Sequence, residues 1–321
     1  MLLRALAASL LWAGAALADA AIVYSTGGKF DASFNESAFA GVGAWRAETG
    51  GDVAEFEPRD IGQMTQGLRR FAARGHDPIV AIGFLQAGAL SDVAPDHPGA
   101  RFAIVDAVVD APNVQSIVFR EHEAAYVGGM LAAMASESGV IGVVGGMDIP
   151  LIRRFACGYA LGAKALDPSI EVLVNFAGDT PAAFSDPARG AELARSQIER
   201  GADVILQAAG GTGIGVLQAA ADAGVLGIGS DSNQNGLHPG AVLTSLRKRV
   251  DVAVMRAFSD WTPGVVSLGL AESGMDWALD EHNAGLITEE MRANALFLAA
   301  AIAKGDVTVH DSSTDGPCPV E

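Results

Sequence analysis

The sequence predicts an α/β fold with two lobes, each built around a mainly parallel β-sheet. Short apolar runs alternate with helical hydrophobic periods along the chain, a pattern typical of βαβ units with a buried sheet. The alternation starts again near residue 114, with no Pro- or Ser-rich linker before it. With 321 residues, the chain is long enough for one large domain or two of ordinary size.

The first set of predicted elements lies between residues 21 and 105. Its first strand is a short apolar run that stops at Gly27-Gly28. Each later strand is a similar run, and segments with apolar residues at helical spacing lie between the strands. The predicted strands are 21–24, 53–56, 79–82 and 101–105, and the predicted helices are 35–49, 64–74 and 87–94.

The second set begins at residue 114 and repeats the same alternation. Its second strand is expected to end at Gly145-Gly146. Because ligands of such sheets bind at the carboxyl ends of the strands, we expect a site where the strand-end loops of both halves converge. The predicted strands are 114–119, 140–144, 172–175, 204–206, 225–228, 242–244 and 265–270, and the predicted helices are 121–137, 152–165, 188–200, 214–223, 250–261 and 288–304.

The first 18 residues resemble a leader rather than part of the fold. One cation, Arg4, precedes an apolar run at 5–18, which is shorter than the roughly 20 residues of a membrane span. The run ends in a small-x-small pattern at 16–18, which is typical of a secretory signal peptide cleaved near Ala18. An uncleaved anchor is the alternative. No cysteine lies nearby to carry a lipid, so we expect a soluble, periplasmic mature chain.

The two cysteines, Cys157 and Cys318, would meet an oxidising compartment after export. A disulfide between them would tie the C-terminal tail to the body of the protein. The alternative is two unpaired thiols, one buried and one on a loose tail. The sequence leaves both open, because it does not show the distance between the two Cα atoms.

Composition and motifs exclude several classes of function. The net charge of −17 would be repelled by nucleic acid and by an anionic membrane surface. None of the six histidines has metal-ligand spacing, and no G-x-S-x-G elbow is present. The glycine-rich stretch at 210–215 does not fit the G-x-G-x-x-G frame. We therefore expect no metal and no cofactor, whereas missing motifs alone do not exclude enzymatic activity.

The loop after the first strand is the most informative segment. Gly27 and Gly28 allow a tight turn and a close approach to a ligand. Ser33 suits the N-cap of the next helix, and Phe34 and Asn35 offer an apolar face and an amide. The loop therefore predicts either a ligand contact or simply a capped helix with a phenylalanine in the core.

The pattern Gly-Gly-x-x-Asp-x-Ser-Phe-Asn at 27–35 resembles the opening motif of the basic membrane protein family, also called the PnrA-like purine nucleoside receptors. These are substrate-binding components of ABC importers. The resemblance implies a type I periplasmic-binding-protein fold, with two Rossmann-like lobes, a hinge and a ligand cleft between the lobes. Further matching segments follow in order at 81–84, 102–106, 125–129, 142–147, 229–234 and 244–251.

The resemblance also implies how the chain is divided. We expect an N-terminal lobe at 19–120 that also receives about 248–270. We expect a C-terminal lobe at 121–247 that also receives about 271–310. Residues 311–321 would form a C-terminal tail.

For a nucleoside ligand, the resemblance assigns the base to two aromatic rings. Phe34 would stack on one face and Phe184 on the other, and stacking on a base contributes about 1–3 kcal/mol. Asn35 could make bidentate contacts to the base edge. Phe184 could instead simply pack beneath a loop.

The ribose hydroxyls would be bound by Asp106 and Asp231, which both follow apolar strands. Lys248 would donate to ring or hydroxyl oxygens. The less specific alternatives are that the aspartates cap helices and that Lys248, flanked by two arginines, belongs to a solvated charged face. The family context favours ligand contact for all three.

Two further positions complete the expected site. Gly211 lies in a turn at a strand end close to the ligand. Ser25 stands where many relatives carry Asp, and Asn233 where some carry a second Asp. A hydroxyl is a weaker, neutral acceptor, so ligand choice or affinity could differ here.

The sequence therefore predicts a solute-binding protein that captures a nucleoside, with a purine favoured, and delivers it to an inner-membrane ABC permease. We expect a monomer, which suits lobe closure. The alternatives are an exported enzyme acting on a nucleoside or small carbohydrate, with Asp106 or Asp231 as general base, and a ligand sensor for a receptor.

Overall fold

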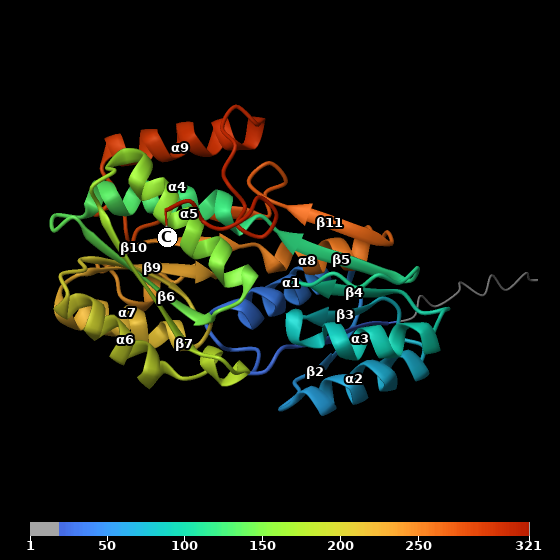
Figure 1. Cartoon of the computed structure of the whole chain (residues 1–321). Helices are drawn as coiled ribbons and strands as arrows, with labels where there is room; N and C mark the ends of the chain where they lie inside the picture. Colours follow the sequence, from blue (N-terminus) through green and yellow to red (C-terminus); the bar gives the residue numbers. More distant parts are fainter. Residues whose placement is uncertain (1–18, 321) are drawn as a thin grey trace, which may run out of the picture.

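Short apolar segments form two six-stranded sheets, one in each half of the molecule (Figure 1). A computed structural model describes residues 19–320, so the leader expected at 1–18 lies outside the described residues. All strand pairs are parallel except one, and helices cover the sheets. The α/β class predicted by the alternating pattern is confirmed.

The first sheet has the strand order β11-β5-β4-β3-β1-β2. Side chains of β1 alternate between its two faces: Ala21 and Val23 pack with α2 and α3, whereas Ile22 packs in the cluster that contains residues of α1 and α8. Both faces are thus buried, as expected of a parallel sheet. The elements are β1 (Ala20–Val23), β2 (Val53–Phe56), β3 (Ile79–Ile82), β4 (Phe102–Val105), β5 (Val114–Phe119), β11 (Gly264–Leu268), α1 (Phe34–Thr49), α2 (Ile61–Ala73), α3 (Ala87–Val93) and α8 (Val250–Ser259).

The second sheet has the order β12-β10-β9-β8-β6-β7, and its edge strand β12 is antiparallel to β10. The elements are β6 (Val140–Met147), β7 (Glu171–Gly178), β8 (Val204–Ala208), β9 (Leu226–Asp231), β10 (Val242–Lys248), β12 (Met275–Trp277), α4 (Glu121–Ala135), α5 (Pro150–Leu166), α6 (Pro187–Glu199), α7 (Thr212–Ala223) and α9 (Glu289–Lys304). Three-residue β12 was not predicted, because the sequence Met-Asp-Trp is too short to establish an alternating pattern.

The expected end of the 140–144 strand at Gly145-Gly146 is wrong. β6 continues to Met147, and Gly145 pairs with Phe176 of β7 and Ala208 of β8. These glycines serve close packing rather than a turn. A Cβ on Gly146 would lie 2.2 Å from the ring of Phe184.

Three connections join the two sheets: β5 to α4, β10 to α8, and β11 to β12. Backbone bonds tie them together, because Arg120 N donates to Leu268 O (2.9 Å) and Arg249 N donates to Gly274 O (2.8 Å). We propose that these connections are the hinge, and that the lobes divide there, as the resemblance implies.

Helices α4 and α5 touch backbone to backbone. A Cβ on Gly129 of α4 would lie 1.9 Å from the carbonyl oxygen of Tyr159, and one on Gly162 of α5 would lie 1.9 Å from that of Tyr126. No side chain fits in this contact, so the two helices form one packed unit.

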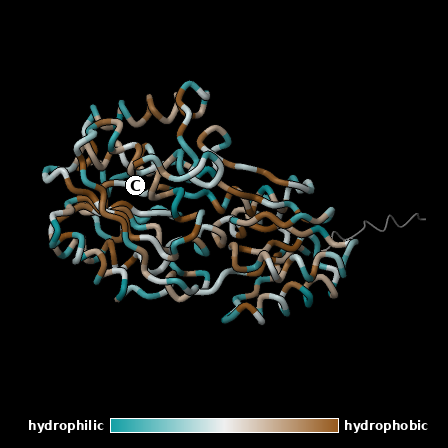
Figure 2. Tube along the Cα trace, in the orientation of Figure 1, coloured by the Kyte–Doolittle hydropathy of each residue, from teal (hydrophilic) through white to brown (hydrophobic). Residues whose placement is uncertain are grey.

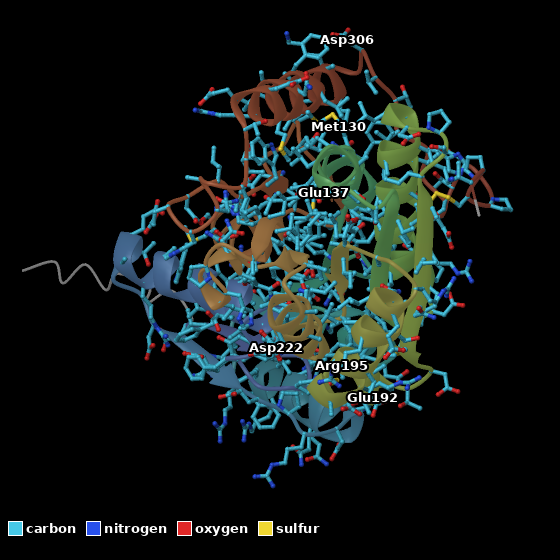
Figure 3. All side chains as sticks on the ribbon, turned by 90° about the vertical axis from the view of Figure 1, so that its left-hand side faces the viewer. Met130, Glu137, Glu192, Arg195, Asp222 and Asp306 are labelled. Carbon is cyan, nitrogen blue, oxygen red and sulfur yellow. A yellow bond between two sulfur atoms is a disulfide. The ribbon has the colours of Figure 1, made fainter. Side chains whose placement is uncertain are left out.

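Hydropathy follows this architecture. Brown, apolar segments concentrate in the strands and teal ones on outer surfaces (Figure 2). Charged residues such as Glu192, Arg195 and Asp222 lie on the outer helices α6 and α7 (Figure 3). Within residues 19–320, no helix is both long and apolar enough to cross a membrane.

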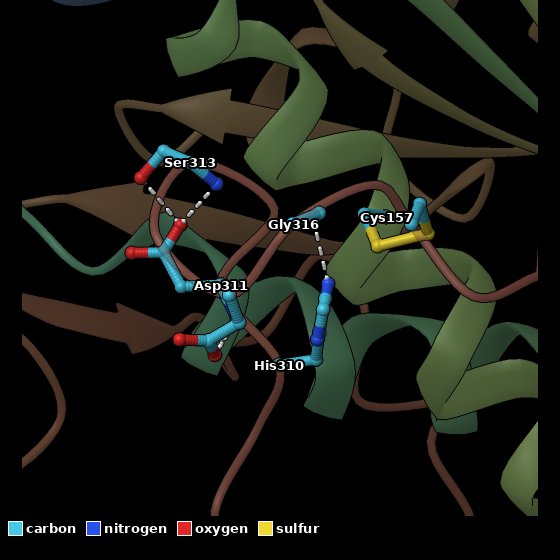
Figure 4. Close-up of a disulfide and its surroundings, with 7 residues drawn as sticks. Cys157, His310, Asp311, Ser313 and Gly316 are labelled. Atoms are coloured by element: carbon cyan, nitrogen blue, oxygen red, sulfur yellow. Dashed lines mark hydrogen bonds between the residues drawn. A yellow bond between two sulfur atoms is a disulfide. The ribbon is translucent and has the colours of Figure 1, made fainter.

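The C-terminal tail is tied to α5 by a disulfide between Cys157 and Cys318, whose Cα atoms lie 5.7 Å apart (Figure 4). Local bonds shape the same tail. The backbone N–H and the hydroxyl of Ser313 donate to Asp311, and His310 Nε2 lies 3.0 Å from Gly316 O. The tail therefore packs against the second sheet's helices.

Removing this disulfide is expected to destabilise the fold. The bond spans 161 residues of sequence, so it restricts the unfolded chain strongly. Replacing both cysteines with serine should lower the free energy of unfolding by about 2–4 kcal/mol. Urea unfolding with and without a reductant measures this. The reductant should have no effect on the double variant, and an equal effect on both proteins would contradict the prediction.

Candidate functional site

A cavity of about 270 Å³ lies between the two sheets, close to the lower end of the roughly 300–1,000 Å³ typical of small-molecule sites. Its walls come from strand-end loops of both sheets and from the first turns of α1 and α5. All eight residues expected from the sequence line this one cavity: Ser25, Phe34, Asn35, Asp106, Phe184, Gly211, Asp231 and Lys248.

Aromatic rings form the apolar part of the cavity. Phe34 opens α1, and Phe184 ends the 3₁₀ turn Pro181–Phe184 from the other half of the chain. Phe84 also lines the cavity, and its ring centroid lies 6.1 Å from that of Phe184. Phe84 was missed as a site residue, although its position in the loop after β3, next to Gly83, was the available signal.

Glycines let Phe184 lie close to the neighbouring backbone. Gly146 faces its ring, and Gly210 and Gly211 lie against its carbonyl oxygen, 3.3 Å from where their Cβ atoms would be. Gly210 has a φ of +56°, in the left-handed region that favours glycine. Gly211 therefore lines the cavity by close approach, and the 210–211 turn positions the ring.

Two aspartates mark the polar part. Asp106 follows β4 and Asp231 ends β9, and both have left-handed backbones, with φ of +70° and +67°. Such conformations cost energy in non-glycine residues and concentrate at functional sites. Asp106 Oδ1 and Ser230 Oγ are buried in the cavity wall without a hydrogen-bond partner among the described residues. Both residues line the cavity, and each keeps an oxygen that no other described group hydrogen-bonds.

Burial raises the pKa of Asp106 to about 6, against the opposing effect of Lys248. Burial also raises the pKa of Asp231, again opposed by Lys248 and by a hydrogen bond from Ser33. Both carboxylates are thus desolvated groups whose charge is balanced mainly by one cation.

The expectation that Ser33 caps α1 through its side chain is wrong. Its hydroxyl donates to Asp231 Oδ2 at 2.7 Å and makes no cap bond. The carboxylate of Asp31 instead accepts from the N–H groups of Asn35 and Glu36, and so caps α1. Ser33 therefore joins the α1 loop to the end of β9.

Two more bonds join the same loops. Ser232 Oγ donates to Ser33 O at 2.6 Å, and Gln234 Nε2 donates to Ala32 O at 2.8 Å. The loop that carries Phe34 is therefore attached to the loop that carries Asp231.

Lys248 is buried rather than part of a solvated charged face. Its Nζ lies 2.6 Å from Asp106 Oδ2 and 2.9 Å from Glu121 Oε1, and 5.5 Å from the centroid of the Phe34 ring. Burial alone lowers the pKa of Lys248, but the charges of Asp106 and Glu121 outweigh it and raise that pKa. The flanking Arg247 pairs with Asp276 instead.

Glu121 was not predicted from the sequence. It is the first residue of α4, its side chain is fully buried, and it also lies 3.0 Å from Arg154. A glutamate after a predicted strand suggests only a helix start, so the sequence gives no signal of its contact with Lys248.

The amide of Asn35 is already bonded to protein. Ser25 N donates to its Oδ1 (2.9 Å), and its Nδ2 donates to the carbonyl of Gly28 (3.1 Å) and, more weakly, to that of Thr26 (3.3 Å). This geometry favours holding the 25–28 loop over reaching a base edge. Asn233 donates to Asp280 and does not line the cavity.

Among residues 19–320, no group of three or more His, Cys, Asp or Glu side chains could hold a metal ion. The cavity instead brings together aromatic rings and polar side chains.

Two α/β lobes, joined by three connections and enclosing such a cavity, define a two-lobed solute-binding protein. The family described as ABC transporter substrate-binding protein PnrA-like matches residues 19–289. The chain belongs to this family.

Two relatives with similar sequences support this family assignment. The ABC transporter nucleoside-binding protein BmpA of Lactococcus lactis is 33% identical over 319 residues, covering 90% of this chain and 88% of that protein. An uncharacterised lipoprotein of Pyrococcus abyssi is 34% identical over 278 residues, covering 81% and 69%.

Solved structures share the fold. A solute-binding protein of an ABC transporter system from Aeropyrum pernix has a TM-score of 0.82 at 28% identity, and the match covers 92% of this chain and 93% of that one. A second, from Conexibacter woesei, has a TM-score of 0.74 at 21% identity, with 92% and 99% covered. The periplasmic-binding-protein fold implied by the resemblance is confirmed.

Proposed function

We propose that this protein is the extracytoplasmic binding component of an ABC importer and that its ligand is a nucleoside, with a purine favoured. The observation that carries the proposal is a single cavity in which aromatic rings lie beside buried, unpartnered oxygens. A base suits the rings, and ribose hydroxyls suit the oxygens. The printed name of the Lactococcus lactis relative supports the same ligand class.

The charges of the cavity favour an uncharged nucleoside over a nucleotide. Three carboxylates, from Asp31, Asp106 and Asp231, line it together with one cation, Lys248. A phosphate would meet like charges in a poorly hydrated space, which is unfavourable. Hydroxyl groups instead donate to carboxylates, in hydrogen bonds that contribute about 1.5–3 kcal/mol.

Transport would proceed by lobe closure without covalent chemistry. The ligand would contact Phe34 from one lobe and Phe184 from the other, so it would shift the equilibrium toward the form in which both walls meet. The permease would then recognise the closed pair of lobes.

Thermal unfolding and calorimetry with four matched probes test this function. Inosine should raise the apparent stability, by about 2.7 kcal/mol at a hundredfold excess over its Kd. Hypoxanthine, ribose and inosine 5′-monophosphate should each bind at least tenfold more weakly, because each lacks one half of the contacts or adds a phosphate. Glu192→Gln, a change on the outer face of α6, should bind inosine as the wild type does.

Two outcomes would contradict the proposal. One is tight binding of the monophosphate or of ribose alone. The other is release of free hypoxanthine from inosine, which would indicate an enzyme instead.

Affinity for inosine should depend on pH. Because burial raises the pKa of Asp106 to about 6, its carboxylate acquires a proton as the pH falls through this value. Protonation removes the negative charge that strengthens the bond to a ligand hydroxyl, so the Kd should be flat above pH ~7 and rise by up to about tenfold per unit below pH ~6. Calorimetry from pH 5 to 8 measures this. Asp106→Asn should give a much flatter profile, and parallel profiles would refute the assignment.

A further inference from the structure

A series of ion-paired, buried side chains begins at the cavity wall and extends to residues that do not line the cavity. Lys248 Nζ lies 2.6 Å from Asp106 Oδ2 and 2.9 Å from Glu121 Oε1, and Glu121 Oε2 lies 3.0 Å from the guanidinium of Arg154. Asp106 and Lys248 line the cavity, whereas Glu121 and Arg154 do not. This series of ion pairs thus connects the ligand site to α4 and α5.

The charged groups of these ion pairs are buried or nearly buried. The side chains of Glu121 and Lys248 are 0% and 1% exposed, and that of Arg154 is 14% exposed. A buried charge is tolerated only when it is paired, so each member depends on its neighbours. Asp106 brings one negative charge to Lys248, and Glu121 brings a second one from the side away from the cavity.

We propose that Glu121 is a positioning residue for ligand binding, which holds the ammonium of Lys248 on one oxygen of Asp106 and leaves the other oxygen free for the ligand. This role rests on the proposed function, because its affinity test uses the proposed ligand class.

The N–H donors of Lys248 decide which oxygen of Asp106 stays free. An ammonium has three N–H donors on a flexible stem. With Glu121 present, it is held between two carboxylates, and Asp106 Oδ1 keeps no hydrogen-bond partner within residues 19–320. Without the charge of Glu121, the ammonium could move onto both oxygens of Asp106 and so compete with a ligand hydroxyl.

Arg154 extends the support to the tail. Its guanidinium lies 3.8 Å from Asp311 Oδ2, and Asp311 lies in the tail attached to α5 through the disulfide of Cys157 (Figure 4). Arg154 therefore pairs with one carboxylate oxygen of Glu121, and Lys248 pairs with the other.

A double-mutant cycle with inosine as the probe tests the proposal. Glu121→Gln should weaken binding at least tenfold, and Lys248→Met should do so as well. The double variant should bind no more weakly than Lys248→Met alone, because Glu121 acts through Lys248. The matched control is Glu123→Gln, in the same turn of α4, where Glu123 pairs with Arg120 instead. Any loss of binding free energy caused by Glu123→Gln should add to the loss caused by Lys248→Met.

A second readout needs no ligand. The chain has four lysines, at 29, 164, 248 and 304, so a spectrum of ¹³Cε-labelled lysine should show four signals. Arginine replacements at 29, 164 and 304 assign the remaining signal to Lys248. In the ligand-free protein, Glu121→Gln should move this signal and Glu123→Gln should not. Glu121→Asp, which keeps the charge on a shorter side chain, should move it as well and serves if Glu121→Gln does not fold.

The two readouts separate the possible failures. If the wild type does not bind inosine but the Lys248 signal moves, the proposed ligand is wrong and the contact of Glu121 stands. If inosine binds and the signal of Lys248 is unchanged in folded Glu121 variants, or the losses in the cycle add, the positioning role is overturned.

Discussion

Replacing Lys248 with methionine is expected to lower the free energy of unfolding by about 3–5 kcal/mol near pH 7.5. This change leaves Asp106 without its cation in a buried site and leaves Glu121 with Arg154 alone. Breaking a buried pair costs more than losing a surface pair, because the remaining charge has neither water nor a partner. Urea unfolding of the ligand-free protein measures the loss.

The difference in free energy of unfolding between the wild type and Lys248→Met should become smaller as the pH falls. Without Lys248, the pKa of Asp106, already raised to about 6 by burial, should rise further. The folded variant then binds a proton at pH values where the unfolded chain, with an ordinary carboxyl pKa near 3.9, does not. Its stability therefore falls as the pH rises, and the loss should be smaller at pH 5.5 than at pH 7.5. Lys304→Met, on an exposed side chain, should change little at either pH. An equal deficit at both pH values would show that the carboxylates are not its cause.

Replacing Phe34 with alanine is expected to raise the Kd for a purine nucleoside by about 10- to 100-fold. Stacking on a base contributes about 1–3 kcal/mol. The ring also lies 5.5 Å from the ammonium of Lys248, so its loss removes a cation–π contact in the same wall. Calorimetry with inosine measures the change. Phe34→Tyr, which keeps the ring, should recover most of the affinity.

Folding provides the check on this variant. Phe34 is only partly buried at the cavity, so the melting temperature of the ligand-free protein should change by a few degrees at most. An unchanged Kd for Phe34→Ala would remove this ring from the proposed site.

The site could be predicted where chemistry and position coincide in the sequence. Asp106 and Asp231 follow apolar strands, and parallel strands direct their ends to one edge, so the sequence alone places both there. The resemblance added Phe184, which lies far along the chain from Phe34. All three line the cavity.

The roles of individual polar side chains could not be predicted in the same way. Ser33 and Asn35 have the right chemistry for a cap and for a base contact, yet Ser33 bonds to Asp231 and Asn35 bonds to loop backbone. Which partner a short polar side chain finds depends on the curvature of the loop, which local sequence does not determine. Glycine is ambiguous for a related reason, since Gly146 permits the approach of a ring rather than a turn.

Glu121 shows the limit most clearly. Its contact with Lys248 depends on two connections between the lobes running side by side, and these are far apart in sequence. Nothing local distinguishes it from an ordinary first-turn glutamate at a helix start.

The disulfide closes a ring that begins in α5, enters the first sheet through α8 and β11, and returns through α9 to the tail. Under a stretching force on the two chain ends, the 161-residue span inside this ring would carry no tension. Two of the three connections between the lobes lie within it, and on the order of 500 Å of extended chain stays hidden from the pull. Reduction of a single bond would therefore change the protein from one in which only about half of the chain can be extended into one that can be drawn out along its whole length.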